Sequence, residues 1–288
     1  MSDNDPTVEA RSLIQWFNDK RGRNYGALEE HTNIFYNMFT ALIGPDEAAK
    51  KLNAQLASSK TPDAGWRARQ LLFAAAAELP WSHSSLVELV HATLQTPPEA
   101  ENSKSLDLGL WSEWGDFHSY LWGRRGLPLN DSDDLRATDR ELSNSERAID
   151  FTSFSAKVLR LGVGKSEIGS MAFFDIRSTL ENSYEEPSLP SHSIVTPEQL
   201  KAIEIEISAQ WILYGEEAVL QLSNEDLGEA WAEGLAVKTE LWHGKAGFSE
   251  DRWKLWKERF LNLAGLDNDS VPQSTKDAAH RAAEQIRT

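Results

Sequence analysis

The chain contains no cysteine, and this absence removes several kinds of chemistry at once. Without a thiol there is no disulfide framework, no thiolate nucleophile, no zinc–thiolate centre and no iron–sulfur cluster. A chain without disulfides fits a reducing compartment, so we expect a cytoplasmic protein. Residues 1–6 (MSDNDP) are acidic and polar, and we therefore expect no signal peptide in this sequence.

Long apolar runs and an excess of basic residues are also missing. No stretch approaches the roughly 18 uninterrupted apolar residues of a spanning helix, so we expect no membrane span. The formal net charge of −16 repels phosphate backbones, which argues against nucleic acid and anionic membrane surfaces as partners. The 288 residues are nevertheless 40% hydrophobic, which is enough to bury a sizeable core.

Signatures of several enzyme classes do not occur either. There is no histidine pair at helical ligand spacing and no His-Glu-x-x-His motif, so we expect no metal. There is no Gly-x-Ser-x-Gly elbow and no Gly-x-Gly-x-x-Gly after a strand. The segment 161–166 (LGVGKS) resembles the end of a phosphate-binding loop, but Leu159 stands where that loop needs its first glycine. We interpret it as a turn between two helices, and we expect no cofactor.

What the sequence does contain is a series of helical patterns with clear start signals. Pro45 stands at a first turn, Thr196 and Gln199 form a capping motif, and Ser249 is an N-cap candidate. The alternating segment 202–208 is interpreted as helix rather than strand, because helix formers dominate its flanks and no partner strand is evident. The pattern predicts helices over residues 8–19, 28–43, 45–57, 63–79, 84–95, 111–122, 143–161, 166–181, 197–222, 250–264 and 274–287, with shorter ones near 225–241.

These helices predict an all-α protein, a single-domain irregular bundle of about ten helices with an aromatic-rich centre. The domain is expected over residues 1–265. Residues 123–142 are interpreted as a long loop inside it, because both halves carry wide aromatic faces that need mutual burial. Residues 266–288 are expected to form a linker and an exposed C-terminal helix. We expect a monomer or a homodimer.

Residues 111–122 (WSEWGDFHSYLW) are the most informative segment, since they hold three of the eleven tryptophans. Wound as a helix, they place the tryptophans, Phe117 and Leu121 on one arc, with His118 in the middle of it. A polar ring in such a face needs a hydrogen-bond partner or a chemical task. His118 is therefore either a core histidine bonded to a carbonyl or carboxylate, or a proton donor, and it is our candidate catalytic residue.

Two other aromatic segments are candidates to face this helix. Residues 210–217 (QWILYGEE) are apolar nearly all round, which is typical of a central helix, and the helix over 250–264 carries two tryptophans on one arc. In the apolar segment 173–178, Asp175 and Arg177 are candidates for a polar network with a buried glutamate, Glu216 or Glu217. The candidate substrate-binding residues are the aromatic side chains of the three helices: Trp111, Trp114, Trp122, Trp211, Tyr214, Trp253 and Trp256.

Several blocks of the sequence resemble a known family. They are residues 71–81 (LLFAAAAELPW), 110–114 (LWSEW), 150–162 (DFTSFSAKVLRLG), 209–214 (AQWILY) and, most specific, 241–260 (LWHGKAGFSEDRWKLWKERF). Over roughly residues 30–265 the chain is similar to the fungal family catalogued as domain of unknown function 3632. The resemblance implies a fungal, soluble, helical protein, and it assigns no catalytic residues.

Three functions remain open. The first, which we favour, is a cofactor-independent enzyme on an apolar small molecule, such as a cyclase, isomerase or pericyclase of fungal secondary metabolism. Its aromatic-walled pocket would fold the substrate while His118 polarises a carbonyl. The second is a non-catalytic helical interaction module, which predicts an exposed aromatic patch instead. The third is a carrier of hydrophobic metabolites, which differs from the enzyme only in lacking turnover.

Overall fold

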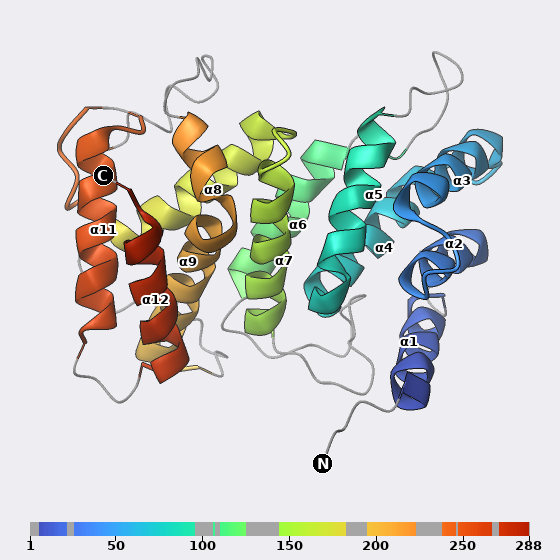
Figure 1. Ribbon diagram of the computed structural model, residues 1–288, viewed down its shortest axis with the longest axis horizontal. Helices are drawn as coiled ribbons and strands as arrows, with labels where there is room; N and C mark the ends of the chain where they lie inside the picture. The colour runs from blue at the N-terminus through green and yellow to red at the C-terminus, as the bar shows by residue number, and fades with distance from the viewer. Residues whose placement is uncertain are drawn as a thin grey trace. The chain divides into compact units, whose positions relative to one another are not determined.

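The computed structural model describes residues 6–21, 26–95, 106, 110–124, 144–182, 195–222, 238–245, 247–266 and 271–287. Every regular element in these ranges is a helix, so the predicted all-α class is confirmed (Figure 1). The elements are α1 (Pro6–Arg21), α2 (Glu29–Phe39), α3 (Pro45–Ser58), α4 (Ala64–Glu78), the short 3-10 helix η1 (Pro80–Ser82), α5 (His83–Gln95), α6 (Leu110–Arg124), α7 (Asn144–Leu159), α8 (Lys165–Leu180), α9 (Pro197–Leu222), α11 (Glu250–Ala264) and α12 (Gln273–Gln285).

The start signals seen in the sequence do begin helices. Pro45 occupies the first turn of α3. At the start of α9, the Gln199 backbone N–H donates to Thr196 Oγ1 at 3.2 Å. The Thr196 backbone N–H donates to Gln199 Oε1 at 2.9 Å. Ser249 Oγ accepts from the Arg252 N–H at 3.2 Å at the start of α11. The alternating segment 202–208 lies inside α9, which confirms the helical interpretation.

The segment that resembles a phosphate loop is the turn between α7 and α8. Gly162 and Gly164 both have positive φ angles, +75° and +61°, which glycine adopts without steric cost. The Gly162 N–H donates to the Leu159 carbonyl at 2.9 Å and closes α7. The Gly164 carbonyl accepts the Ile168 N–H at 2.8 Å and opens α8. The interpretation as a turn between two helices is therefore confirmed.

The chain divides into two compact units, with the division inside α6. Unit 1 takes residues 1–117 and 129–143, and unit 2 takes residues 118–128 and 144–288. The single domain expected over residues 1–265 remains a prediction. In unit 1, α3 packs against α5 and α2 (Figure 1). Fully buried apolar side chains fill this unit, among them Phe35, Leu52, Leu72, Phe73 and Leu89.

In unit 2, the long helix α9 packs against α7, α8 and α12 (Figure 1). The approach of α7 and α9 is close at Gly215, where an added Cβ would come within 3.3 Å of the Ala156 Cβ and carbonyl oxygen. Trp211, Phe151 and Phe154 are fully buried in this unit. The aromatic-rich centre predicted for the fold is thus present in the described helices.

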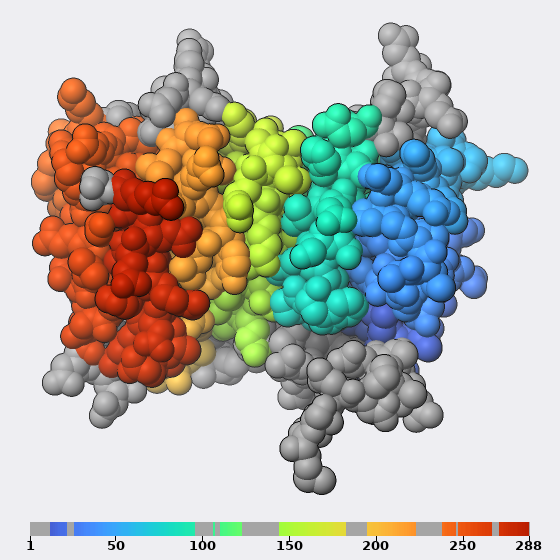
Figure 2. All heavy atoms as spheres, in the orientation of Figure 1, coloured from blue at the N-terminus to red at the C-terminus, as the bar shows by residue number. Residues whose placement is uncertain are grey.

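The C-terminal helix α12 is exposed on one side only, whereas the sequence predicted an exposed helix. It packs against α9 and α11, and Figure 2 shows its other side on the surface. Alanine at positions 278, 279, 282 and 283 gives it a flat apolar face that is buried, as is Ile286. Lys257 of α11 donates to the Ile286 carbonyl at 2.8 Å. The expectation missed this face because small alanines give only a weak apolar signal.

Some predicted segments lie outside the described residues. They include residues 125–143, which hold nearly all of the predicted loop near 123–142, and residues 223–237 of the predicted short helices. Residues 238–245 are described and are not helical. Among the described helices, none is both long enough and apolar enough to cross a membrane.

Candidate functional site

The helix predicted at 111–122 is α6, and it places His118 against an acidic side chain of α8. His118 Nε2 lies 2.9 Å from Asp175 Oδ2, between residues 57 positions apart in the sequence. The His118 residue is 6% exposed and Asp175 is fully buried. A buried carboxylate is costly unless it is paired, so this contact stabilises both side chains. The His118 ring thus has the hydrogen-bond partner that a buried polar ring needs, and that partner is a carboxylate.

Two residues of α9 fix the position of Asp175. Trp211 Nε1 donates to the same oxygen, Oδ2, at 2.8 Å, and Ser208 Oγ donates to the Asp175 backbone carbonyl at 3.1 Å. An indole N–H can only donate, so Oδ2 is an acceptor. A carboxylate oxygen that accepts in this way takes the Nε2–H of His118 as well. Nδ1 is then the basic nitrogen of the neutral imidazole.

Beside this pair lies a partly exposed aromatic surface. The His118 and Trp122 rings are nearly parallel, with centroids 6.4 Å apart and planes 20° apart. Trp122 also meets Phe174 of α8 edge to face at 5.9 Å. Trp122 is half-buried, and Phe174 is 45% exposed. We call His118, Trp122 and Phe174 the α6–α8 strip, because their rings are neighbours on these two helices and the two aromatic rings are partly exposed.

Three of the predicted substrate-binding tryptophans are completely enclosed. Trp114, Trp211 and Trp256 have no solvent-accessible surface, so not even a water-sized space adjoins them. Trp114 packs edge to face on Phe73 at 5.5 Å, and Trp111 lies 5.6 Å from Trp114 in the same unit. A ligand reaches these three rings only if neighbouring side chains move. Their role in substrate binding remains a prediction. What the structure shows for Trp211 is the hydrogen bond that positions Asp175.

The remaining predicted residues lie elsewhere in unit 2. Tyr214 is 37% exposed, and the Lys157 ammonium group lies 4.5 Å from its ring centroid. Burial lowers the pKa of Lys157, and the Asp150 carboxylate opposes that shift. Trp253 packs against Trp256 at 5.1 Å and is nearly parallel to Phe248 at 6.3 Å.

A second buried polar cluster is centred on Glu181, directly after α8. Its Oε1 accepts from Arg252 Nε at 2.5 Å and Trp256 Nε1 at 2.7 Å. Its Oε2 accepts from Arg252 Nη2 at 2.8 Å and Thr239 Oγ1 at 2.9 Å. The Glu181 backbone carbonyl accepts the Leu241 N–H at 2.9 Å. Both ionic side chains are fully buried, and four donors satisfy the carboxylate.

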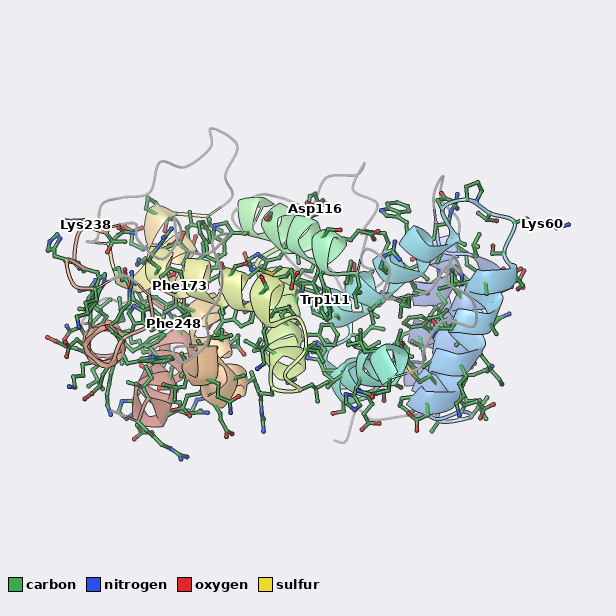
Figure 3. The ribbon with its side chains drawn as sticks, turned by 90° about the horizontal axis from the view of Figure 1, so that it is seen from above. Lys60, Trp111, Asp116, Phe173, Lys238 and Phe248 are labelled. Carbon is green, nitrogen blue, oxygen red and sulfur yellow. The ribbon has the colours of Figure 1, made fainter. Side chains whose placement is uncertain are left out.

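This cluster accounts for the most specific sequence block, residues 241–260. Arg252 Nη1 also donates to the Gly247 carbonyl at 2.9 Å, and its guanidinium lies 4.7 Å from the Phe173 ring. Phe173 meets Phe248 edge to face at 5.0 Å, and Figure 3 shows the two labelled rings close together. The arginine and aromatic residues of the block therefore fasten the non-helical segment before α11 to the end of α8.

Sequence reasoning identified His118 but not its partner. Asp175 was expected in a polar network with Glu216 or Glu217, and it lies in one with His118 and Trp211 instead. The Glu216 carboxylate accepts the Arg287 backbone N–H at 3.4 Å. Glu181 was missed because a glutamate at a helix end gives no sequence signal when its partners come more than 50 residues later. Among the described residues, no group of three His, Asp or Glu side chains forms a metal site.

The comparisons with known proteins agree with the resemblance seen in the sequence. No curated protein and no solved structure matches the chain. The family model described as protein of unknown function (DUF3632) matches residues 70–260, which is more than half of the 288 residues and contains the α6–α8 strip and the Glu181 cluster. The chain therefore belongs to the DUF3632 family of proteins of unknown function.

Proposed function

We propose that the protein is a cofactor-independent enzyme that isomerises or cyclises an apolar small molecule. The observation that carries the proposal is the His118–Asp175 hydrogen bond, set beside the partly exposed rings of Trp122 and Phe174. A histidine held by a buried carboxylate is suited to accept and return a proton. An isomerisation of this kind removes a proton from one carbon and returns it to another. The His118 imidazole can do both, so the proposal needs no cofactor.

His118 Nδ1 takes the role of acid and base in this proposal. The ring removes a proton next to a carbonyl or an alkene of the substrate, and it returns that proton at another carbon. Asp175 stabilises the imidazolium that forms between these steps, because its carboxylate stays bonded to Nε2–H. The apolar rings of Trp122 and Phe174 hold the substrate body in a reactive conformation. The substrate and the product then have the same mass.

The test compares wild-type protein with His118→Gln on an organic extract of the organism that encodes the chain. Glutamine keeps an N–H donor for Asp175 but cannot take a proton at neutral pH. We expect wild-type protein to deplete one component and to produce a new chromatographic peak of identical mass. His118→Gln should slow this conversion by about 100-fold or more. His280→Gln, an exposed histidine of α12, is the matched control and should convert normally.

Two outcomes would contradict the proposal. Equal conversion by wild-type protein and His118→Gln would remove His118 from the chemistry. An apolar compound that stays bound in native mass spectrometry, with no isomer formed, would favour the carrier. The exposure of Phe174 is the observation that favours the interaction module, and concentration-dependent sedimentation abolished by Phe174→Ala would support that alternative.

The biological setting that we propose is fungal secondary metabolism in the cytoplasm. The sequence resemblance supports the fungal setting. The absence of cysteine supports the cytoplasm, because a chain without disulfides fits a reducing compartment. The proposed partner is a hydrophobic small molecule, bound by a monomer or a homodimer.

A further inference from the structure

The loop before α11, residues 238–245 and 247–248, carries exposed residues but is held by a buried group. Thr239 Oγ1 donates to Glu181 Oε2, and the Leu241 N–H donates to the Glu181 carbonyl, both at 2.9 Å. Glu181 is itself fully buried. Loops that bind ligands are commonly positioned by a rigid scaffold in this way. We call this segment the pre-α11 loop, and its exposed residues start from a fixed backbone.

Trp242 supports the pre-α11 loop from within. Its ring is buried, and its Nε1 donates to the Lys245 carbonyl at 3.1 Å, so the chain turns around the indole. The backbone passes so close that a Cβ added at Gly244 would lie 2.4 Å from the Trp242 ring. The guanidinium of Arg252 lies 5.2 Å from the same ring. The shape of the loop over residues 242–245 therefore depends on glycine at position 244.

Three basic residues of the pre-α11 loop are exposed, namely Lys238, His243 and Lys245. Their side chains make no hydrogen bond or ion pair with any residue that the structure describes. The Thr239 N–H donates to the Trp242 carbonyl at 3.4 Å, so Lys238 and His243 start from neighbouring points of the folded chain. His243 and Lys245 are two residues apart, and their Cα atoms are separated by at most about 7 Å.

The acidic residues around these cations do not cancel them. Glu240 is the one acidic residue in the sequence of residues 238–248. At the start of α11, the Glu250 carboxylate lies 2.7 Å and the Asp251 carboxylate 3.7 Å from the Lys254 ammonium group. In a chain of net charge −16, this loop is a local cationic surface.

The same positions also offer backbone donors. The N–H groups of His243, Gly244 and Lys245 donate to no other residue in the described part of the chain. Successive unpaired backbone N–H groups in an irregular turn form an anion-binding arrangement. Lysine and histidine side chains add charge-assisted hydrogen bonds to phosphate oxygens.

We propose that the pre-α11 loop binds a phosphate group, with the Lys245 ammonium, the His243 imidazole and the backbone N–H groups of residues 243–245 as its donors. Inorganic phosphate and a phosphate monoester present the same group, and at pH 7 a monoester carries a charge of about −1.5 to −2. The site is independent of the proposed isomerisation, because it uses no residue of the α6–α8 strip.

The test follows backbone amide signals by NMR while inorganic phosphate replaces sodium chloride at constant ionic strength. In the wild-type protein, we expect the signals of residues 243–245 to move and to saturate. Lys245→Gln should weaken the phosphate dissociation constant by about tenfold, because it removes one charged donor. Lys50→Gln, which replaces an exposed lysine of α3, is the matched control and should bind as the wild type does.

A second variant tests whether the shape of the loop matters. Gly244→Ala places a Cβ against the Trp242 ring, so the affinity for phosphate should fall although His243 and Lys245 are kept. Titration with phenyl phosphate distinguishes the two sources of the group. Tighter binding than that of inorganic phosphate would identify an esterified ligand, and weaker binding would identify the free ion.

Several results would overturn the inference. Signals of residues 243–245 that do not saturate would mean that no phosphate site exists there, and an unchanged affinity in Lys245→Gln would place the site elsewhere. Acetate that binds as tightly as phosphate would show that the loop does not select this group. Circular dichroism records the folding of each variant, and the exposed Lys245 decides the question if Gly244→Ala is unfolded. His118→Gln should keep its affinity for phosphate, whatever its effect on isomer formation.

Discussion

At the scale of single residues, His31 on α2 is a histidine that burial keeps neutral. It has no exposed surface, and neither ring nitrogen makes a hydrogen bond of acceptable geometry among the described residues. Burial lowers the pKa of His31 below its ordinary value of 6.5 and outweighs the other groups. The Gln55 side chain and the Glu30 carboxylate oppose the shift, and Arg67 adds to it. The folded protein therefore favours the neutral ring more than the unfolded chain does.

We expect the stability of the protein to fall as the pH drops below about 6.5, the ordinary value for histidine. Below that pH, His31 is protonated in the unfolded chain but stays neutral in the folded chain, which favours unfolding. The free energy of unfolding therefore falls from about pH 6.5 down to the lowered pKa of His31 in the folded protein. Urea unfolding at pH 7.5 and at pH 5.5 measures the effect. His31→Phe should have a smaller difference between the two pH values, and an unchanged difference would contradict the assignment.

Asp175 is expected to act on His118 through the position of one hydrogen. The variant Asp175→Leu would remove the oxygen that accepts from both His118 and Trp211, so the imidazole ring would turn or change tautomer. Nitrogen-15 NMR of histidine side chains should show the His118 signals move from the Nε2–H pattern, with His280 unchanged as an internal reference. Isomer formation should fall by about 100-fold. Unchanged His118 signals would show that Asp175 does not set the tautomer of His118, and would contradict its role in the proposed proton transfer.

At the scale of elements, Glu181 joins α8, α11 and the segment before α11. Replacing its carboxylate leaves the fully buried Arg252 without an ionic partner, which costs about 3–5 kcal/mol in comparable buried pairs. We expect Glu181→Gln to lower the denaturant midpoint by a corresponding amount. Glu250→Gln, which breaks an exposed pair with Lys254 on α11, is the control and should change little. Comparable losses in the two variants would contradict this role for Glu181.

A similar carboxylate in unit 1 holds α1 against α4. Glu78 accepts from Trp16 Nε1 at 2.7 Å and from Lys20 Nζ at 3.0 Å, and all three side chains are buried. Glu78→Gln removes the charge opposite a buried ammonium group. Hydrogen exchange should then rise in peptides of α1 and stay the same in peptides of α9. The exposed Glu88 of α5 gives the control variant, Glu88→Gln, in which protection of α1 should be kept.

Helices were predictable from the sequence because their signals are local. The face of α6 was predicted correctly, with Trp114, Phe117, His118 and Leu121 buried, since apolar spacing along one helix is enough to define it. The partner of His118 was not predictable, because Asp175 follows 57 residues later and side-chain direction across helices depends on packing. The spacing of apolar residues within one helix shows which of its faces is buried. The pairing of polar side chains depends on which helices pack together, and that information is not local in the sequence.

At the scale of the whole molecule, the net charge of −16 predicts a response to salt. Repulsion among surface carboxylates destabilises a folded chain, and added ions screen it over distances of about 10 Å at 0.1 M. We expect the melting temperature to rise by a few degrees when sodium chloride is added to a low-salt buffer. The buried pair of Glu181 and Arg252 should be screened much less than the surface. A fall in melting temperature would mean that attraction between surface charges dominates.

The Glu181 cluster also sets an order of events for a chain made from its N-terminus. Trp256, which completes the bonds to the carboxylate, follows Glu181 by 75 residues. At a synthesis rate of roughly 5–20 residues per second, Trp256 is made about 4–15 seconds after Glu181. In unit 1 the order is reversed, because Trp16 and Lys20 already exist when Glu78 is made. Unit 1 can thus close while the ribosome is still at work, whereas a chain stopped before residue 256 leaves unit 2 with a buried-site glutamate that lacks its last donor.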